Sequence, residues 1–343
     1  MTEPVATLRW AVLAESVVGA SHTRSGKPNQ DAIDCVQRTT GALPLLLAVA
    51  DGHGGSAYFR SEIGARLAVK TALALGEDFL ETFSEEEAVN GPSYQRLRDL
   101  CGLIVKQWNE EVDLDLSRNP LEDTDPARSN LPVGMDQGLS MDRLEEIDPM
   151  RRNRPTGIDT DLDNHSRVDT DLMKKRNRPP LMNARIPYGS TLLLVIVTEQ
   201  AIIYLQLGDG DIMTVADDGT VQAVPGAVHL LGNETQSLCM PAAWDDFVVR
   251  CVPMNDGVPS LIMVSTDGYR NSYPEDASFE KVAQDLAQLL STDEGEQNVC
   301  ANLNAWLLET TKMGSGDDIT VGLIFRQVAS NFKNSPSVSK AGD

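Results

Sequence analysis

Several features that would place the chain in a specialised class of protein are missing from its 343 residues. No apolar run approaches the roughly 20 residues that a membrane-spanning helix needs. The first 21 residues are interrupted by Arg9 and Glu15, so they lack the apolar core of a secretory signal. The five cysteines are scattered, and no Cys-x-x-Cys pair offers a zinc or redox site. We therefore expect a soluble protein of the reducing cytoplasm, without a membrane partner.

Positive charge and aromatic side chains are also scarce. The 29 Lys and Arg face 51 Asp and Glu, which gives a formal net charge of −22. A nucleic-acid partner would require clustered Lys and Arg on its phosphates, so we expect none. Although only 5% of the residues are aromatic, 41% are hydrophobic, which is enough for a real core. The composition indicates an acidic globular protein suited to cations or basic partners.

One long stretch differs from the rest in composition. Residues 113–185 contain no Phe, Trp or Tyr and are rich in Asp, Arg, Asn and Pro, so they cannot bury a core. We expect a polar, partly disordered insertion there, a single domain formed by residues 1–112 and 186–330, and a disordered tail over 331–343. The insertion is either a segment that docks a partner or a tolerated loop.

An apolar run that stops on an acid stands out at residues 45–55, Leu-Leu-Leu-Ala-Val-Ala-Asp-Gly-His-Gly-Gly. Six apolar residues suit a strand buried on both faces, which places Asp51 at the end of that strand. The glycines on either side of His53 allow the backbone to approach a ligand closely. Taken alone, the Asp-Gly pair could equally be a simple turn.

The same pattern recurs along the chain, and the repetition favours a site over a turn. An apolar strand is bounded by an acid in a polar or Gly-rich turn at Asp31, Asp51, Asp209, Asp267 and Asp317. Carboxylates gathered at one edge of a sheet pair would repel one another, and divalent cations relieve that repulsion. Oxygen ligands without a Cys or His cluster favour Mg²⁺ or Mn²⁺.

Hydrophobic periodicity predicts the elements that carry these acids. We expect a polar loop over residues 19–31. We expect strands over 10–18, 45–50, 192–198, 201–207, 212–216, 260–265 and 319–325, with the third and fourth forming an antiparallel hairpin. Helices are expected after Gly55, through the repeat of Phe59, Ile63 and Leu67, and over 94–112, 279–290 and 297–311.

The acids lie in motifs that resemble a known family, the PPM or PP2C-type metal-dependent protein serine/threonine phosphatases, and in particular a bacterial-like member with a long insertion. The resemblance covers about residues 9–74 and 188–326. The motifs that carry it are Asn29-Gln30-Asp31, Asp51-Gly52-His53-Gly54-Gly55, Gly189-Ser190-Thr191, Gly208-Asp209, Ser265-Thr266-Asp267-Gly268 and Gly316-Asp317-Asp318. Each is weak alone, but their order and spacing together are specific.

The resemblance implies an α+β fold, a four-layer α-β-β-α sandwich of two antiparallel sheets flanked by helices. It implies two ions of Mn²⁺ or Mg²⁺, and possible ligands for a third, among Asp31, Asp51, Gly52, Asp209, Asp267 and Asp317. Within this set Asp51 would bridge two ions, the Gly52 carbonyl would bind one of them, and Asp31 would act through bound waters. Asp318 occupies a position outside the ligand set.

The implied activity is hydrolysis of phosphoserine and phosphothreonine in a phosphorylated protein substrate. Water activated by two cations would attack phosphorus while His53, beside Asp51, protonates the departing oxygen. Two other hypotheses remain open: a catalytically inactive phosphatase-like module that binds phosphoproteins, and a hydrolase of small phosphate esters.

Three positions depart from the family pattern. Gln30 stands where the family has Glu, which removes a negative charge next to the metals. Gly26 stands where many members have a phosphate-binding Arg, and His22, Arg24 or Lys27 could replace it. Asp211 reverses the charge of an Arg, with no evident catalytic meaning.

Overall fold

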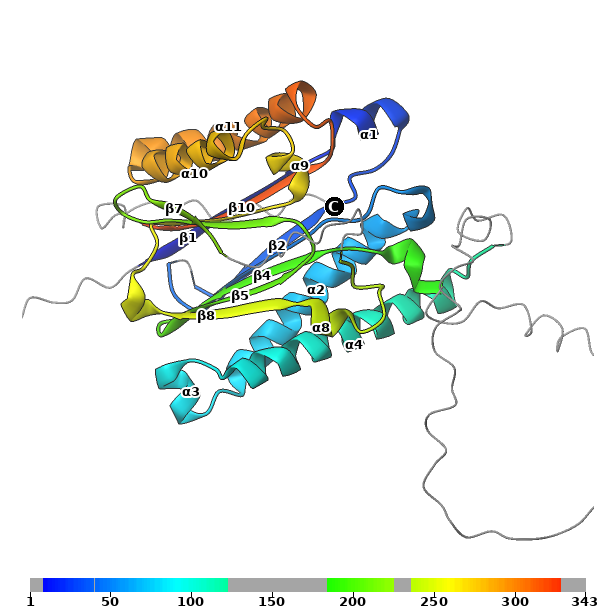
Figure 1. Cartoon of the computed structure of the whole chain (residues 1–343), viewed down its shortest axis with the longest axis horizontal. Helices are drawn as coiled ribbons and strands as arrows, with labels where there is room; N and C mark the ends of the chain where they lie inside the picture. The colour runs from blue at the N-terminus through cyan, green and yellow to red at the C-terminus, as the bar shows by residue number, and fades with distance from the viewer. Residues whose placement is uncertain (1–8, 40, 123–183, 225–235, 328–343) are drawn as a thin grey trace, which may run out of the picture.

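The computed structural model describes residues 9–39, 41–122, 184–224 and 236–327 (Figure 1). The expectations for the greater part of the insertion, 123–183, and for the tail lie outside these residues.

The strands are β1 Trp10–Val17, β2 Ala32–Gln37, β3 Leu45–Ala50, β4 Leu192–Val197, β5 Ala201–Leu207, β6 Asp211–Val215, β7 Val221–Ala223, β8 Val248–Pro253, β9 Leu261–Ser265 and β10 Ile319–Arg326. The α-helices are α1 Ala20–Ser25, α2 Ser61–Glu81, α3 Glu85–Asn90, α4 Tyr94–Arg118, α8 Ala243–Asp246, α9 Asp267–Arg270, α10 Asp276–Leu290 and α11 Asp293–Met313. Short 3-10 turns cover η1 Ser56–Tyr58, η2 Ile186–Tyr188 and η3 Met254–Asp256.

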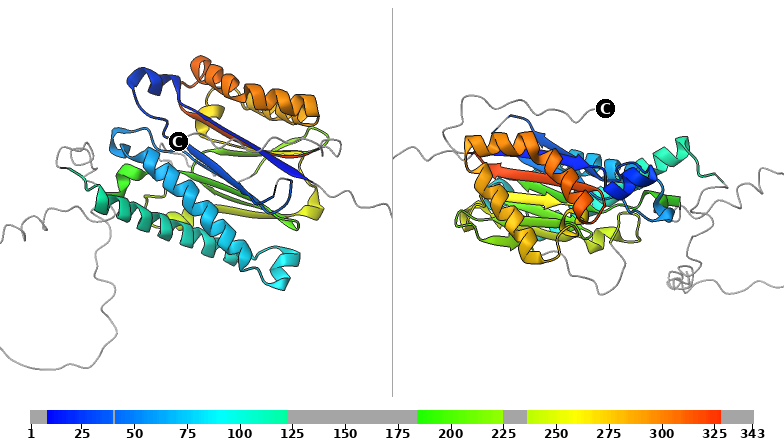
Figure 2. Two further views of the ribbon diagram at one scale, coloured as in Figure 1. Left: turned by 180° about the vertical axis from the view of Figure 1, so that it is seen from behind. Right: turned by 90° about the horizontal axis from the view of Figure 1, so that it is seen from above.

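The strands form two five-stranded sheets, ordered β1-β10-β9-β6-β7 and β2-β3-β4-β5-β8. Every pair of neighbours is antiparallel. Helices α10 and α11 cover the outer face of the first sheet, and α2 and α4 cover the outer face of the second (Figures 1 and 2). The expected four-layer α-β-β-α sandwich is thus confirmed. Among the described helices, none combines the length and apolar character needed to cross a membrane.

The central strands are apolar throughout because both of their faces are covered. In β3, Leu46, Ala48 and Ala50 pack toward α2 and α4. The alternate residues Leu45, Leu47 and Val49 pack into the layer between the two sheets. This alternation with period two explains why a run with no polar position is a strand and not a surface element.

Several local expectations were wrong. The loop expected over residues 19–31 contains the short helix α1. Strands β2, β7 and β8 were not expected. The insertion was expected to begin at residue 113, but α4 continues to Arg118.

The residues at the two expected boundaries of the insertion belong to the folded body. Arg185 makes a two-pronged ion pair with Asp113, at 2.8 and 2.6 Å. The hydroxyl of Tyr188 donates to Asp115. Composition alone missed this because the acids of the last turn of α4 resemble those of the polar segment that follows.

Helix α2 packs closely against η2 at Gly64, and this close packing can be tested by substitution. A Cβ added to Gly64 would lie 1.8 Å from the Tyr188 carbonyl oxygen, and the Gly64 carbonyl also accepts the Trp108 indole N–H at 3.0 Å. We expect Gly64→Ala to lower the free energy of unfolding by about 1–3 kcal/mol, the usual cost of overpacking. The matched control is Gly102→Ala in α4, where a Cβ meets nothing within 4 Å. That change should raise stability by about 1 kcal/mol through helix propensity. Urea unfolding of both variants measures the difference, and a neutral Gly64→Ala would contradict the packing argument.

Candidate active site

The five acids named from the sequence lie at one end of the sandwich because of the antiparallel pairing. Asp51 follows β3, Asp209 follows β5 and Asp267 follows β9, whereas Asp31 precedes β2 and Asp317 precedes β10. The first residue of β2 pairs with the last residue of β3, and the start of β10 lies beside the end of β9. Antiparallel pairing therefore brings strand ends and strand starts to the same edge.

A hydrogen bond joins the two sheets at this edge. Thr266, directly after β9, donates its hydroxyl to Asp31 Oδ2 at 2.8 Å, although the two residues belong to different sheets. The turn between β5 and β6, which carries Asp209, also crosses from one sheet to the other. The acids of both sheets thus face a common space.

Three of the carboxylates that face this space have raised pKa values. Burial, with the negative charge of Asp318 added, raises the pKa of Asp31 well above its usual value. Burial raises the pKa of Asp51 likewise, and the neighbouring Asp31 and Asp267 add to the effect. The pKa of Asp267 is also raised, again mainly by burial.

A divalent cation bound among these carboxylates would oppose the shifts in pKa, because it stabilises the ionised form of each carboxylate. Buried carboxylates that raise one another's pKa are stabilised as anions when a positive ion lies between them. The donors here are hard oxygens, as Mg²⁺ and Mn²⁺ prefer. The residues present therefore fit the expected metals.

The backbone of residues 51–53 is held on both sides. The amide of Asp51 donates to Thr191 Oγ1 at 2.9 Å, and the His53 amide donates to the Gly189 carbonyl at 3.1 Å. On the other side the Gly52 amide donates to the Gln30 carbonyl at 3.1 Å. A Cβ on Gly52 would lie 2.5 Å from that same carbonyl oxygen, so only glycine fits. The Asp-Gly-His motif is rigid because three segments converge on it.

His53 follows Asp51 and Gly52 in the chain, and its ring packs on an aromatic side chain. Its ring meets that of Tyr58 edge to face, with centroids 4.8 Å apart. Burial lowers the pKa of His53, and the negative charge of Asp209 acts in the opposite direction. A protonated imidazole in this place is a stronger acid than one in water, with a carboxylate near enough to favour its charged form.

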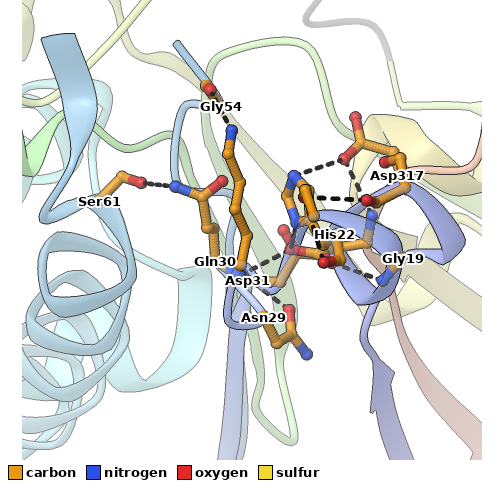
Figure 3. Close-up of polar contacts among 12 residues, drawn as sticks. Gly19, His22, Asn29, Gln30, Asp31, Gly54, Ser61 and Asp317 are labelled. Atoms are coloured by element: carbon orange, nitrogen blue, oxygen red, sulfur yellow. Dashed lines mark hydrogen bonds and ion pairs between the residues drawn. The ribbon is translucent and has the colours of Figure 1, made fainter. Parts of the chain in front are cut away.

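Gln30 points away from the carboxylates (Figure 3). Its amide nitrogen donates to Ser61 Oγ on α2 and to the His53 carbonyl at 3.3 Å. Its amide oxygen is buried and has no hydrogen-bond partner. Gln30 therefore ties the His53 loop to α2 through neutral hydrogen bonds.

The three candidates for phosphate binding have different surroundings. Lys27 Nζ donates to the Gly54 carbonyl at 3.1 Å, at the edge of the Asp-Gly-His loop. Arg24 is exposed on α1. His22 is buried with both ring nitrogens facing carboxylates, a poor setting for an anion. Lys27 and Arg24 remain as predictions for this role.

Asp211, the third departure, lies at the start of β6. Burial raises its pKa to about 6, although the positive charge of Arg270 opposes the shift. Arg270 of α9 therefore lies close to Asp211.

The hydrogen-bond network around Asp318 could not be predicted from the sequence. This residue is 4% exposed, and its carboxylate accepts the amide N–H groups of Gly19 at 2.6 Å and Gln30 at 2.7 Å. It also bonds His22 Nδ1 at 2.9 Å. These contacts join segments almost 300 residues apart, so no local pattern signals them. The sequence clue was only the second acid of the Asp317-Asp318 pair.

Comparisons with known proteins show the family of the chain. The family model described as Protein phosphatase 2C matches residues 18–308. No curated protein sequence matches the chain significantly.

Among solved structures, the S. agalactiae serine/threonine phosphatase is 17% identical, with 92% of this chain and 99% of that chain covered and a TM-score of 0.48. The catalytic domain of the serine/threonine phosphatase PstP, in complex with two manganese ions, is 13% identical over 94% and 100%, with a TM-score of 0.48. Stp1 from Staphylococcus aureus is 13% identical over 95% and 97%, with a TM-score of 0.46. With most of its length matched by the family model, the chain belongs to the protein phosphatase 2C family of serine/threonine phosphatases.

Proposed function

We propose that the protein hydrolyses phosphoserine and phosphothreonine in other proteins, in a reaction that depends on two divalent cations, Mn²⁺ or Mg²⁺. The observation that carries the proposal is the cluster of partly buried carboxylates, Asp31, Asp51 and Asp267, whose pKa values are raised at one edge of both sheets. All five cysteines are free, which suits the reducing cytoplasm as the place of action.

Each residue of the cluster has a place in this proposal. Asp51 and the Gly52 carbonyl would hold the ions from β3, and Asp267 and Asp317 would hold them from the other sheet. Asp31 would act through water, and Asp209 would serve a weaker third ion. Bound cations supply an activated water and neutralise charge on the phosphoryl oxygens.

The remaining steps belong to side chains of the protein. His53 donates a proton to the departing serine or threonine oxygen, which would otherwise leave as a strongly basic alkoxide. Gln30 and Gly189 fix the backbone on either side of that histidine. Lys27 and Arg24 orient the phosphate before the attack.

Metal removal tests the proposal. We expect hydrolysis of phosphoserine and phosphothreonine peptides with Mn²⁺ or Mg²⁺, loss of it in EDTA, and its return when excess metal is added. Release of inorganic phosphate measures each case, with a phosphotyrosine peptide and p-nitrophenyl phosphate as comparison substrates. Turnover that persists in EDTA would contradict metal dependence. Binding of the phosphopeptides without turnover would identify an inactive binding module instead, and turnover of p-nitrophenyl phosphate alone a hydrolase of small esters.

A further inference from the structure

His22 is enclosed by two acids from the start of β10. It lies on α1 and is only 8% exposed. Its Nδ1 lies 2.9 Å from Asp318 Oδ2, and its Nε2 lies 3.9 Å from Asp317 Oδ1 (Figure 3). The imidazole and the two carboxylates present ligand atoms that all lie within 4.8 Å of one another.

The contacts of Asp318 determine which nitrogen of His22 carries a proton. Both oxygens of Asp318 already accept backbone N–H groups, from Gly19 and from Gln30. A carboxylate that accepts in this way requires a donor at His22 Nδ1. In the neutral imidazole, Nε2 then carries the free lone pair.

That lone pair faces Asp317 across a gap that is too long for a hydrogen bond. A hydrogen bond between nitrogen and oxygen spans about 2.7–3.2 Å, whereas these atoms are 3.9 Å apart. Since each ligand atom lies about 2.1 Å from a divalent metal, two ligands of one cation lie at most about 4.2 Å apart, so a separation of 3.9 Å is within reach of one ion. A metal-binding histidine also typically donates its other N–H to a carboxylate, as His22 does to Asp318.

We infer that His22 is a metal ligand: its Nε2 binds, together with Asp317, one of the divalent cations of the active site. This inference rests on the proposed function only in placing an ion at Asp317. An imidazole ligand favours a transition metal such as Mn²⁺ over Mg²⁺, which prefers an all-oxygen shell. His22 thus biases the choice of metal, and Asp318 is the positioning residue that aims its ring.

Pulsed electron paramagnetic resonance of the Mn²⁺-loaded full chain tests the inference directly, because it detects a nitrogen nucleus bound to the metal. We expect nitrogen modulation from imidazole in the wild type. It should disappear in His22→Gln, whose amide can still donate to Asp318. It should persist in the matched variant His53→Gln, which removes the other histidine near the site. No nitrogen signal in the wild type, or a signal that survives in His22→Gln, would overturn the inference.

Metal affinity gives a second readout that needs no turnover. Calorimetric titration of the metal-free chain should show His22→Gln weakening Mn²⁺ binding by at least about tenfold, in the range seen when a metal-site partner is lost. Mg²⁺ binding should change much less. If His22→Gln weakened the binding of Mn²⁺ and of Mg²⁺ equally, His22 would only hold Asp317 in place. That result would overturn its role as a ligand. Failure of the proposed function would look different: phosphopeptides would not be hydrolysed, whatever the nitrogen signal.

Discussion

Asp51→Asn should reduce metal-dependent hydrolysis of phosphopeptides by at least about 10³-fold while the protein stays folded. Asp51 is the carboxylate whose pKa is raised by burial and by both Asp31 and Asp267, so it lies at the centre of the cluster. A metal ion contributes several kcal/mol of charge stabilisation to such a reaction, and each 1.36 kcal/mol is tenfold in rate. Steady-state release of phosphate at saturating Mn²⁺ measures the loss. Asp267→Asn should behave in the same way, because it faces Asp51 from the other sheet.

The same substitution should stabilise the metal-free protein. Because the pKa of Asp51 is raised on folding, its carboxyl costs stability once the pH exceeds its unfolded pKa of about 3.9, and the cost reaches its full size above the raised value. Asn removes this cost, so the melting temperature in EDTA should rise near pH 7. The difference should vanish below about pH 3.9, where the carboxyl is protonated in both states. Added Mn²⁺ should then raise the melting temperature of the wild type more than that of the variant.

The matched control is Asp78→Asn, which removes one exposed carboxylate near the C-terminal end of α2. Its neighbour Glu77 bonds Arg38, which follows β2 and so lies at the opposite end of that strand from Asp31. It should leave both turnover and the response to Mn²⁺ unchanged. If Asp51→Asn kept near wild-type activity, or if it destabilised the metal-free protein, the assignment of Asp51 as the central metal ligand would be wrong.

Much of the fold could be predicted because its strongest signals are local. Leu45–Ala50 and Leu192–Val197 are apolar at every position, and strands buried on both faces have this pattern. Asp51 was found for the same reason, since it directly follows Leu45–Ala50, whereas Asp31 adjoins β2, whose residues are only partly buried. Strands β2, β7 and β8 were missed because their residues are partly exposed and carry no continuous apolar run, and all three lie at the edges of their sheets.

The contacts around the acids could not be predicted, because they join distant parts of the chain. Gln30 was expected to alter the metal shell through its missing charge, yet its side chain bonds Ser61 and the His53 carbonyl. His22 was considered for phosphate, yet it faces Asp317 and Asp318. In both cases residue identity suggested a chemistry, and only the packing of α1 and α2 decided where the side chain points.

The surroundings of His53 support its proposed role as a general acid. Burial lowers its pKa, so the protonated ring gives up its proton more readily, and the negative charge of Asp209 helps to keep that proton available. The backbone on both sides is fixed, by the bond of its own amide to the Gly189 carbonyl and by the bond of Gln30 to its carbonyl. A general acid matters only when the leaving oxygen is strongly basic, as a serine or threonine alkoxide is and a nitrophenolate is not.

His53→Ala should therefore slow phosphopeptide hydrolysis by on the order of 10²–10⁴, the usual contribution of a positioned acid. Hydrolysis of p-nitrophenyl phosphate should fall far less, because its leaving group departs without protonation. The two rates are compared at saturating Mn²⁺, with Tyr58→Leu as a control that removes the ring packed on His53 but keeps the imidazole. A histidine that bound the metal would depress both substrates alike and raise the Mn²⁺ requirement, and a purely structural histidine would change neither rate much. Equal losses on the two substrates would exclude the acid role, whereas a selective loss on the phosphopeptide follows only if His53 protonates the departing oxygen.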